Sequence, residues 1–328
     1  MVSKKKTVLV LFLLLLLLLL SCVCSICVGA VMFHPLQLFT ESAGSAAGRI
    51  LRYSRLPRTC CSVLAGASLA VAGAVIQNVL ANPLAAPNII GVNSGAGFMA
   101  AVCCALFPFG GGWIPVFAFA GALMSVLIIL GISEGCGASR MTLVLAGVAI
   151  SSLFSGATDA VVTFVPDALS GYTDFRIGGF RGVTMARLQP AAVLIGIGLV
   201  LVFLLVHEMD LLALGTETAQ SLGLRVRPVR LLLLFAAAML AGAAVSFSGI
   251  LGFVGLLVPH MVRKLTGNSA LPLLLGCALG GAALVTICDT AARSLFSPFE
   301  IPVGIVLSLL GAPFFLWLLL GSKRRTCA

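Results

Sequence analysis

Ten apolar runs, most of them long enough to cross a membrane as a helix, constrain this chain more than any other feature. A helix that crosses a hydrocarbon core of about 30 Å needs roughly 20 residues, since each residue adds about 1.5 Å. The eighth run is short and contains Pro259, so we expect a broken or partly re-entrant helix there. The runs cover residues 8–33, 59–80, 91–109, 114–132, 141–164, 188–206, 230–249, 250–263, 270–288 and 301–320.

Charged residues are too scarce for a soluble protein. Only 9% of the 328 residues are charged and 60% are hydrophobic, whereas a soluble domain carries about a quarter charged residues. Such a chain cannot cover a globular surface with polar groups. The sequence therefore predicts an all-α, polytopic membrane protein, with about ten transmembrane helices in a single transmembrane domain over residues 1–328.

The first run has a second interpretation. Lys4, Lys5 and Lys6 precede a leucine stretch that ends in Leu20-Ser21-Cys22, which is similar to a signal peptide with a lipoprotein-like cleavage site. However, the apolar stretch continues to Phe33 without a polar break, which is long enough to span. We favour a retained helix.

Basic residues predict the orientation of the chain. Ten spans put both termini on one side, and basic residues mark the cytoplasmic side of membrane proteins. Lys4–Lys6 and the basic run 323–325 therefore place both termini in the cytoplasm. Membrane lipid is then a partner along every span.

Four arginines in one outer loop oppose this trend. Arg49, Arg52 and Arg55 are spaced along one helical face, and we expect that helix to end near Leu56 because the residue before a proline disfavours helix. Arg58 follows directly. The loop is either an amphipathic helix on lipid headgroups or a basic surface for an acidic partner.

Several classes of function lack their motifs. The chain has no phosphate-binding G-x-x-x-x-G-K-[ST] loop, its histidines are scattered, and its one C-x-x-C, at Cys24 and Cys27, has no further ligands nearby except His34. We expect no catalytic residues, cofactor, metal site or nucleic-acid partner. An ion-coupled secondary transporter stays open but weakly supported, since the only carboxylates in or at the edge of the runs are Asp159 in the fifth and Asp289 at the edge of the ninth.

A weak repeat relates the two halves of the chain. Leu64–Ala67 recurs as Leu240–Ala243, and the offset of 176 also relates three later pairs. Chance is an alternative in a chain so rich in alanine and glycine. A true duplication joins an inward to an outward span, which predicts an inverted repeat of the kind found in transporters. The later pairs are Gly73 with Gly249, Pro83 with Pro259 and Gly91 with Gly267.

The polar stretch 207–230 lies on the predicted cytoplasmic side. Gly215 suits the start of a short helix and Gly223 suits its end. This helix either rests on the membrane or is a coupling helix that inserts into another subunit.

A series of short motifs along the chain resembles, in sequence and in order, the permease subunits of ATP-driven importers for iron chelates, haem and cobalamin. The resemblance covers nearly the whole chain. The motifs are Arg55-Leu56-Pro57-Arg58, Leu64–Ala67, Gln77, Asn82-Pro83-Leu84-Ala85 with Pro87, Gly91-Val92, Ser94-Gly95-Ala96, Leu145–Ala149, Gly178-Gly179-Phe180, Leu214-Gly215, Ala219, Leu222-Gly223, Gly252–Leu256 with Pro259-His260, Pro302-Val303-Gly304 and Gly311-Ala312-Pro313.

The resemblance implies a set of partners. Two permease subunits, identical or paralogous, surround a pathway in the bacterial inner membrane and contact two separate ATPase subunits. A substrate-binding protein delivers the cargo, and the permease alternates between inward-facing and outward-facing states. An iron-siderophore is the expected cargo, with haem or cobalamin as alternatives. The scarcity of charge suggests a mostly apolar pathway that does not trap a large chelate.

The resemblance also implies site residues. Arg55, Arg58 and Arg293 match outer arginines that meet glutamates on the two lobes of the binding protein. Residues of the coupling loop, Glu217, Ala219 and Gly223, receive the ATPase, although Thr216 stands where relatives often have an acidic residue. Residues of the pathway or gate are Asn82, Pro83 and Gly91.

Overall fold

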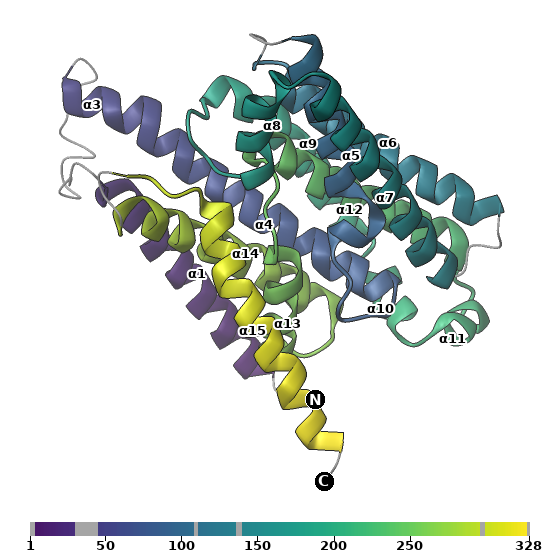
Figure 1. Ribbon diagram of the computed structural model, residues 1–328. Coiled ribbons are helices and arrows are strands. Elements are labelled where there is room, and N and C mark those ends of the chain that lie inside the picture. The colour runs from purple at the N-terminus through teal and green to yellow at the C-terminus, as the bar shows by residue number, and fades with distance from the viewer. Residues whose placement is uncertain (1–3, 30–44, 108–110, 136–139, 296–298, 327–328) are drawn as a thin grey trace.

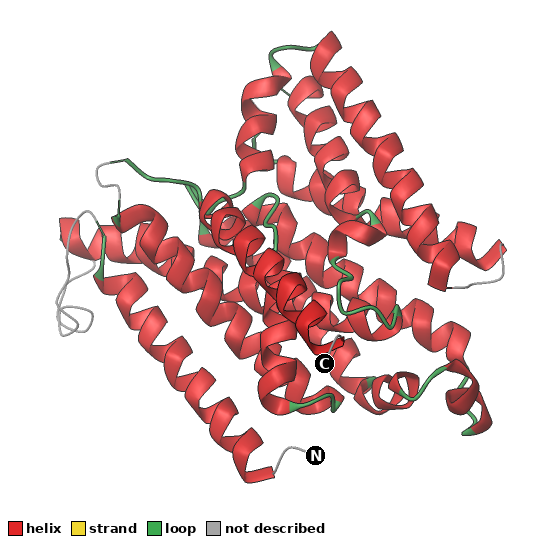
Figure 2. Ribbon diagram, turned by 60° about the horizontal axis from the view of Figure 1, so that its bottom comes forward, coloured by secondary structure: helices red, strands yellow, loops and turns green. Residues whose placement is uncertain are grey.

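The computed structural model describes residues 4–29, 45–107, 111–135, 140–295 and 299–326. In this part of the chain every regular element is a helix, and short loops join them (Figures 1 and 2). In chain order the elements are α1 (Lys4–Cys27), α3 (Ala46–Ile50), the π-helical turn η1 (Leu51–Arg55), α4 (Leu56–Val79), the 3-10 turn η2 (Pro87–Ile90), α5 (Val92–Leu106), α6 (Ile114–Gly135), α7 (Arg140–Phe164), α8 (Ala168–Ile177), α9 (Met185–Leu204), α10 (Val206–Ala213), α11 (Thr216–Ser221), α12 (Val226–Ser248), α13 (Val254–Thr266), α14 (Ala270–Ser294) and α15 (Val303–Thr326).

Seven helical segments of the described chain are long and apolar enough to cross a membrane. They are α1, the continuous segment Ala46–Val79, α6, α7, α9, α12 and α14. The apolar helices Val92–Leu106 and Val303–Leu316 are shorter. The predicted all-α, polytopic membrane fold is confirmed.

Two helices form the centre of the molecule. In their most apolar windows, α4 is 78% buried and α12 is 83% buried, against 17% for α1 and 28% for α7 and for α9. α4 packs against α12, α13 and α14, and α12 also contacts α6 and α9. The outer helices expose leucine, valine and phenylalanine, as expected for surfaces that face lipid rather than water.

Close helix contacts rest on glycine. A Cβ at Gly66 of α4 would lie 2.2 Å from the Gly281 carbonyl oxygen of α14, and one at Gly281 would lie 2.3 Å from the Gly66 oxygen. Gly95 of α5 and Gly121 of α6 make the same reciprocal contact. Small residues at such positions let membrane helices approach until their backbones touch.

The arginine-bearing outer helix does not end at Leu56, so that prediction was wrong. The helix runs from Ala46 to Val79, and a π-helical turn lies before Pro57. In this turn the Leu56 N–H bonds to the Leu51 carbonyl, five residues back. A widened turn makes room for the proline ring, and the first turn of α4 does not need the N–H that proline lacks.

The backbone between α12 and α13 is irregular at Gly249–Phe253. The Ile250 N–H donates to the Phe175 carbonyl at the end of α8 (3.0 Å), and the Gly179 N–H donates to Ser248 (2.8 Å). Phe253 has a left-handed conformation (φ 65°), and α13 then continues through Pro259. Other backbone groups of the protein thus form hydrogen bonds with this irregular segment, as a membrane interior requires.

The two copies of the first repeated motif have the same secondary structure. Leu64–Ala67 and Leu240–Ala243 both lie inside long helices, α4 and α12, that pack together. Two later pairs do not correspond, because Gly73 lies inside a helix whereas Gly249 ends one, and Pro83 lies in a turn whereas Pro259 lies inside α13. Gly91 and Gly267 do correspond, since both end a helix with a positive φ. The inverted relation of the two halves stays a prediction.

Candidate functional site

A polar cavity of about 460 Å³ opens between α5, α7 and α8. Ser94 of α5 donates a hydrogen bond to Ser151 of α7 at its edge (3.2 Å). Asp159, Tyr172 and Arg176 bring charge and a phenol to it. The other polar groups that line the cavity are amides and hydroxyls, from Asn88, Asn93, Ser155 and Thr158.

One face of α7 supplies much of this lining. Ser151, Ser155, Thr158 and Asp159 follow a spacing of three to four residues, which places them on one side of the helix. The four-residue spacing between Ser155 and Asp159 could be read from the sequence. Its neighbours on α5 and α8 became apparent only from the fold.

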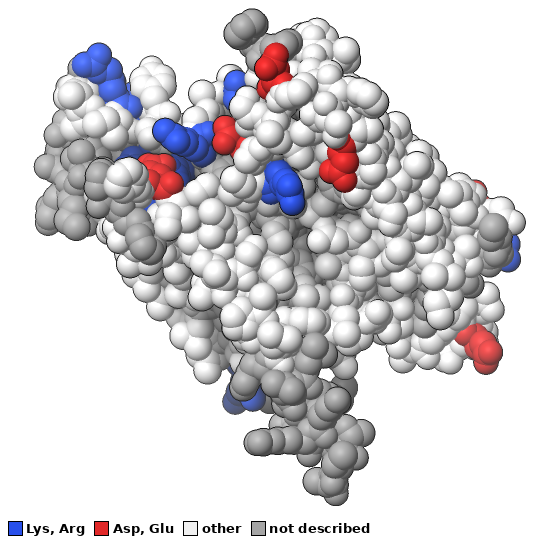
Figure 3. Space-filling view, in the orientation of Figure 1, with Lys and Arg blue, Asp and Glu red and all other residues white. Residues whose placement is uncertain are grey.

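The end of the molecule that holds the start of α4 gathers charged groups. Arg58 of α4 binds Asp289 of α14 through Nε, at 3.1 and 3.0 Å from the two carboxylate oxygens, and through Nη2 at 3.0 Å. Its Nη1 donates to Glu300 at 2.9 Å. Figure 3 shows basic and acidic side chains side by side at the upper left, with most of the remaining visible surface uncharged.

The structure brings the three predicted docking arginines together around Asp289. Arg293 lies 3.7 Å from the Asp289 carboxylate and donates to the hydroxyl and carbonyl of Ser25 on α1. Arg55 donates to the Val28 carbonyl just after α1. Arg55 and Arg293 are only 7% and 6% exposed, and the Arg58 side chain 13%. The buried cluster therefore joins α1, α4 and α14.

Exposed charge surrounds this cluster. Arg58, Phe180, Arg181 and Glu300 line two neighbouring hollows of about 280 and 480 Å³. Partial burial acts to raise the pKa of Glu300, but its hydrogen bond and ion pair with Arg58 prevail and hold that pKa below its usual value. Arg181 and Arg293 act in the same direction as Arg58. Arg181, which sequence reasoning missed, is exposed beside the Gly178-Gly179-Phe180 motif.

The predicted coupling residues lie on and beside the short helix α11. Gly215 and Gly223 flank it with left-handed backbones (φ 105° and 86°), which glycine adopts without strain. Glu217 is exposed in its first turn, whereas Ala219 is fully buried. Arg230 Nη2 lies 3.5 Å from the hydroxyl of Thr216, so α12 contacts the start of α11.

A second contact ties this region to a core helix. The Asp210 carboxylate on α10 accepts a hydrogen bond from the Ala270 N–H at the start of α14 (2.7 Å). The first N–H groups of a helix have no partner within it, so Asp210 acts as a cap.

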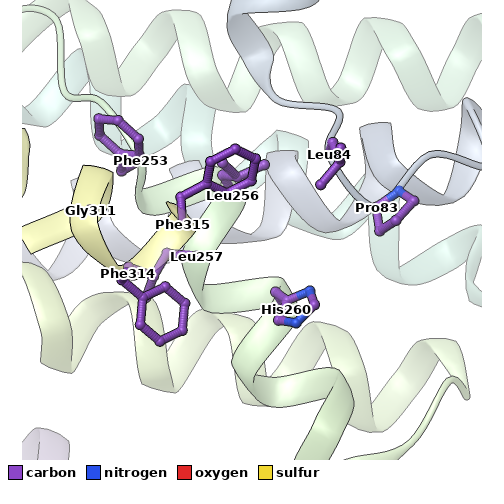
Figure 4. A pocket seen from close by; sticks show the side chains of 9 residues that line it. All are labelled: Pro83, Leu84, Phe253, Leu256, Leu257, His260, Gly311, Phe314 and Phe315. Atoms are coloured by element: carbon purple, nitrogen blue, oxygen red, sulfur yellow. The ribbon is translucent and has the colours of Figure 1, made fainter. Parts of the chain in front are cut away.

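The predicted gate residues lie in the turn between α4 and α5. Asn82 Oδ1 accepts the Leu84 N–H (2.9 Å), and Pro83 and Leu84 face His260 of α13 and Phe314 of α15 across a crevice of about 10 Å³ (Figure 4). Such a volume holds at most about one water molecule, so the crevice is closed.

Gly91 lies at the other end of this segment and packs tightly. It has a left-handed backbone (φ 72°), and a Cβ there would lie 2.3 Å from the Ser125 hydroxyl. Any other residue would therefore strain both backbone and packing.

The cysteines and acidic groups do not form a metal centre in the described chain. No group of three histidine, cysteine, aspartate or glutamate residues lies close enough to hold a metal ion there. The described cysteines are all free, and Cys61, Cys103 and Cys277 are buried among apolar residues.

Comparison with known proteins gives a consistent result. The FecCD transport family model matches residues 16–321. The chain is 35% identical to an Fe(3+)-citrate import system permease protein of Bacillus subtilis over 306 residues, 92% of each chain. It is 38% identical to a hemin transport system permease protein of Yersinia pestis over 312 residues, 91% of each chain.

A solved structure shares the fold. It is an inward-facing conformation of a metal-chelate type ABC transporter, with a TM-score of 0.83 and 29% identity, and the match covers 95% of this chain and 99% of that one. Family model, sequence relatives and fold agree along almost the whole length, and the chain therefore belongs to the FecCD transport family.

Proposed function

We propose that this chain is the permease subunit of an ATP-binding cassette importer that takes up an iron chelate of the siderophore type. A substrate-binding protein delivers the chelate, two separate ATPase subunits drive alternating access, and a second permease subunit, identical or paralogous, completes the pathway. The observation that carries the proposal is the match to import permeases over nine-tenths of the chain. Haem or cobalamin is the alternative cargo, because relatives named for hemin and vitamin B12 import match about as well.

The polar face of α7 supports a pathway at a subunit interface. Ser155 and Asp159 are exposed on the single subunit although they belong to a membrane-spanning helix. Polar groups there are costly against lipid and normally face a bundle interior or a water-filled cavity. A second permease subunit opposite α7 would enclose the polar cavity and keep lipid from it.

The lining of the cavity suits a passing chelate. Its amides and hydroxyls offer neutral hydrogen-bonding groups to the oxygen atoms that bind iron in a chelate, while Asp159 and Arg176 bring one charge of each sign. Contacts of this kind are individually weak and let the cargo leave. The cavity is thus more polar than the mostly apolar pathway that the sequence suggested.

The coupling role rests on the geometry of α11. The helix exposes Glu217 while Ala219 anchors it, and the Thr216 and Asp210 contacts join this region to α12 and α14. Movement imposed on α11 by an ATPase would therefore reach α12 directly and α14 through α10. ATP can shift the permease between its inward-facing and outward-facing states only if the ATP-bound ATPase binds one of these states more tightly than the other.

The arrangement of the ends supports a cytoplasmic location for both termini. The start of α1 and the end of α15 lie at one end of the molecule, and α11 lies toward the same end (Figure 1). α3 and α8 lie toward the opposite end, as does the arginine cluster at the start of α4. We assign the end with α11 to the cytoplasm.

The docking role of Arg55, Arg58 and Arg293 takes a revised form. The three arginines are buried, so we assign them the task of shaping and charging the outer surface, with Arg58 alone partly open to a partner. Acidic side chains of a binding protein would approach through the hollows beside Arg58.

Reconstitution in lipid nanodiscs with the ATPase subunits of the same genome tests the proposal. We expect ATP hydrolysis to rise when the loaded substrate-binding protein is added. An ion-coupled secondary transporter would instead take up cargo without ATPase subunits and lose uptake on Asp159→Asn. That result would overturn the proposal.

A further inference from the structure

The two ends of the Arg58 guanidinium differ in environment. Nε and Nη2 bind Asp289, whose side chain is fully buried, whereas Nη1 binds Glu300, whose side chain is 45% exposed. Water screens an exposed ion pair, so the Glu300 contact contributes little net free energy. The Asp289 contact is bidentate and shielded. Asp289 therefore fixes Arg58, while Glu300 is replaceable.

Open space lies on both sides of the replaceable contact. The smaller hollow reaches from the Arg58–Glu300 pair to Asp174 and Pro302, and the larger one reaches to Tyr53 on η1. Both are large enough to admit a side chain. Phe180 and Arg181 line both hollows, so a cation and an aromatic ring stand beside the pair.

Arg181 is the available cation of this surface. It is exposed, and it forms no ion pair within 4 Å in the part of the chain that the structure describes. An arginine can bind a carboxylate through two parallel hydrogen bonds. A carboxylate in either hollow would meet Arg181 and the open side of Arg58 together.

We propose that Glu300 occupies, within this chain, the place on Arg58 that an acidic side chain of the docking protein takes, and that Arg181 is the second cation that receives this side chain. The inference rests on the proposed docking of a substrate-binding protein. Docking exchanges an internal carboxylate for an external one. Glu300 thereby weakens attachment and keeps a second carboxylate beside the buried arginine cluster while no partner is bound.

The test measures the affinity of the docking protein for the full permease–ATPase complex in nanodiscs at low ionic strength. The probe is the substrate-binding protein from the same genome that stimulates the ATPase activity. Glu300→Gln should tighten binding about 3- to 5-fold, since it removes a competitor of the strength of an exposed ion pair. Arg181→Gln should weaken binding by a similar factor.

Asp174→Asn provides the matched control. Asp174 is exposed and lines the smaller hollow, so its change removes the same charge from the same surface, but its carboxylate forms no ion pair within 4 Å in the described chain. We expect less than about a twofold change, because only long-range electrostatics are altered.

The outcomes separate the two proposals. Docking that is unchanged or weaker in Glu300→Gln, with wild-type docking intact, overturns the exchange but leaves the importer function standing. A tightening as large in Asp174→Asn would likewise overturn it, because a general charge effect would then suffice. If wild-type protein neither docks nor responds in ATPase activity, the importer function itself fails.

Discussion

Arg58 and Asp289 are 231 positions apart in the chain, yet they form a bidentate ion pair at 3.0 Å between the start of α4 and the end of α14. Asp289 is fully buried and also receives Arg293, so one carboxylate serves two arginines. A buried charge is tolerated only when it is paired and hydrogen-bonded. This relationship fixes the start of α4 against the end of α14 and presents the rest of Arg58 to the surface.

Asp289→Asn should destabilise the protein by about 3–5 kcal/mol, because it leaves Arg58 and Arg293 buried without their shared counter-charge. The free energy of unfolding in mixed detergent micelles measures this. Asp167→Asn is the control, since Asp167 is exposed at the start of α8 without a capping hydrogen bond. A loss no larger than that of the control would contradict the role given to Asp289.

Gly66→Ala should cost about 1–3 kcal/mol, because the added methyl group would collide with the Gly281 carbonyl of α14 and push the helices apart. Gly131→Ala is the matched change inside α6, where a Cβ would meet nothing within 4 Å. It should leave stability unchanged or raise it by roughly 0.5–1 kcal/mol. Equal thermal unfolding of the two variants would refute the close contact.

The Glu300 pair should respond to acid. Arg58, together with Arg181 and Arg293, lowers the pKa of Glu300 in the folded protein. The stability that this pair contributes is therefore fully present above the pKa of Glu300 in the unfolded chain, near 4.5. It is lost as the pH falls through the lower pKa of the folded protein. Wild type and Glu300→Gln should therefore differ by a constant amount in melting temperature at neutral pH. The gap should close only below about pH 4.5. A gap that closes between pH 8 and 6 would contradict this assignment.

Glu217→Lys should reduce ATPase stimulation by the binding protein, because it reverses an exposed charge in the first turn of α11 and opposes the helix dipole there. Asp167→Lys makes the same charge reversal just before α8, which lies toward the opposite end of the molecule. Co-purification of the ATPase subunits reports whether assembly or coupling is lost. Full stimulation in Glu217→Lys would remove α11 from the coupling path.

Much of the helical architecture could be predicted because hydropathy and length are local properties. The long apolar runs at 114–132, 141–164 and 270–288 correspond to α6, α7 and α14. α8 was missed because its ten residues are too short and mixed in polarity to stand out. The helix through Pro57 was missed because a π-helical turn, which depends on packing, overrides the local preference of proline.

The site was harder to predict, since it depends on contacts between distant residues. The spacing of Arg49, Arg52 and Arg55 suggested a basic helical face, and the family resemblance singled out Arg55, Arg58 and Arg293. Nothing local indicated that Asp289 and Ser25 would bury them. The polar face of α7 was visible in the spacing of its serines, but the cavity needs α5 and α8 beside it.

Uptake into sealed proteoliposomes tests the central claim most directly. The chain is reconstituted with the ATPase subunits and binding protein of the same genome, and radioactive iron in a siderophore complex is followed into the lumen. We predict accumulation that requires ATP hydrolysis on the ATPase side and is unaffected when proton and sodium gradients are collapsed. Accumulation driven by an ion gradient, without ATP or the ATPase subunits, would contradict the account.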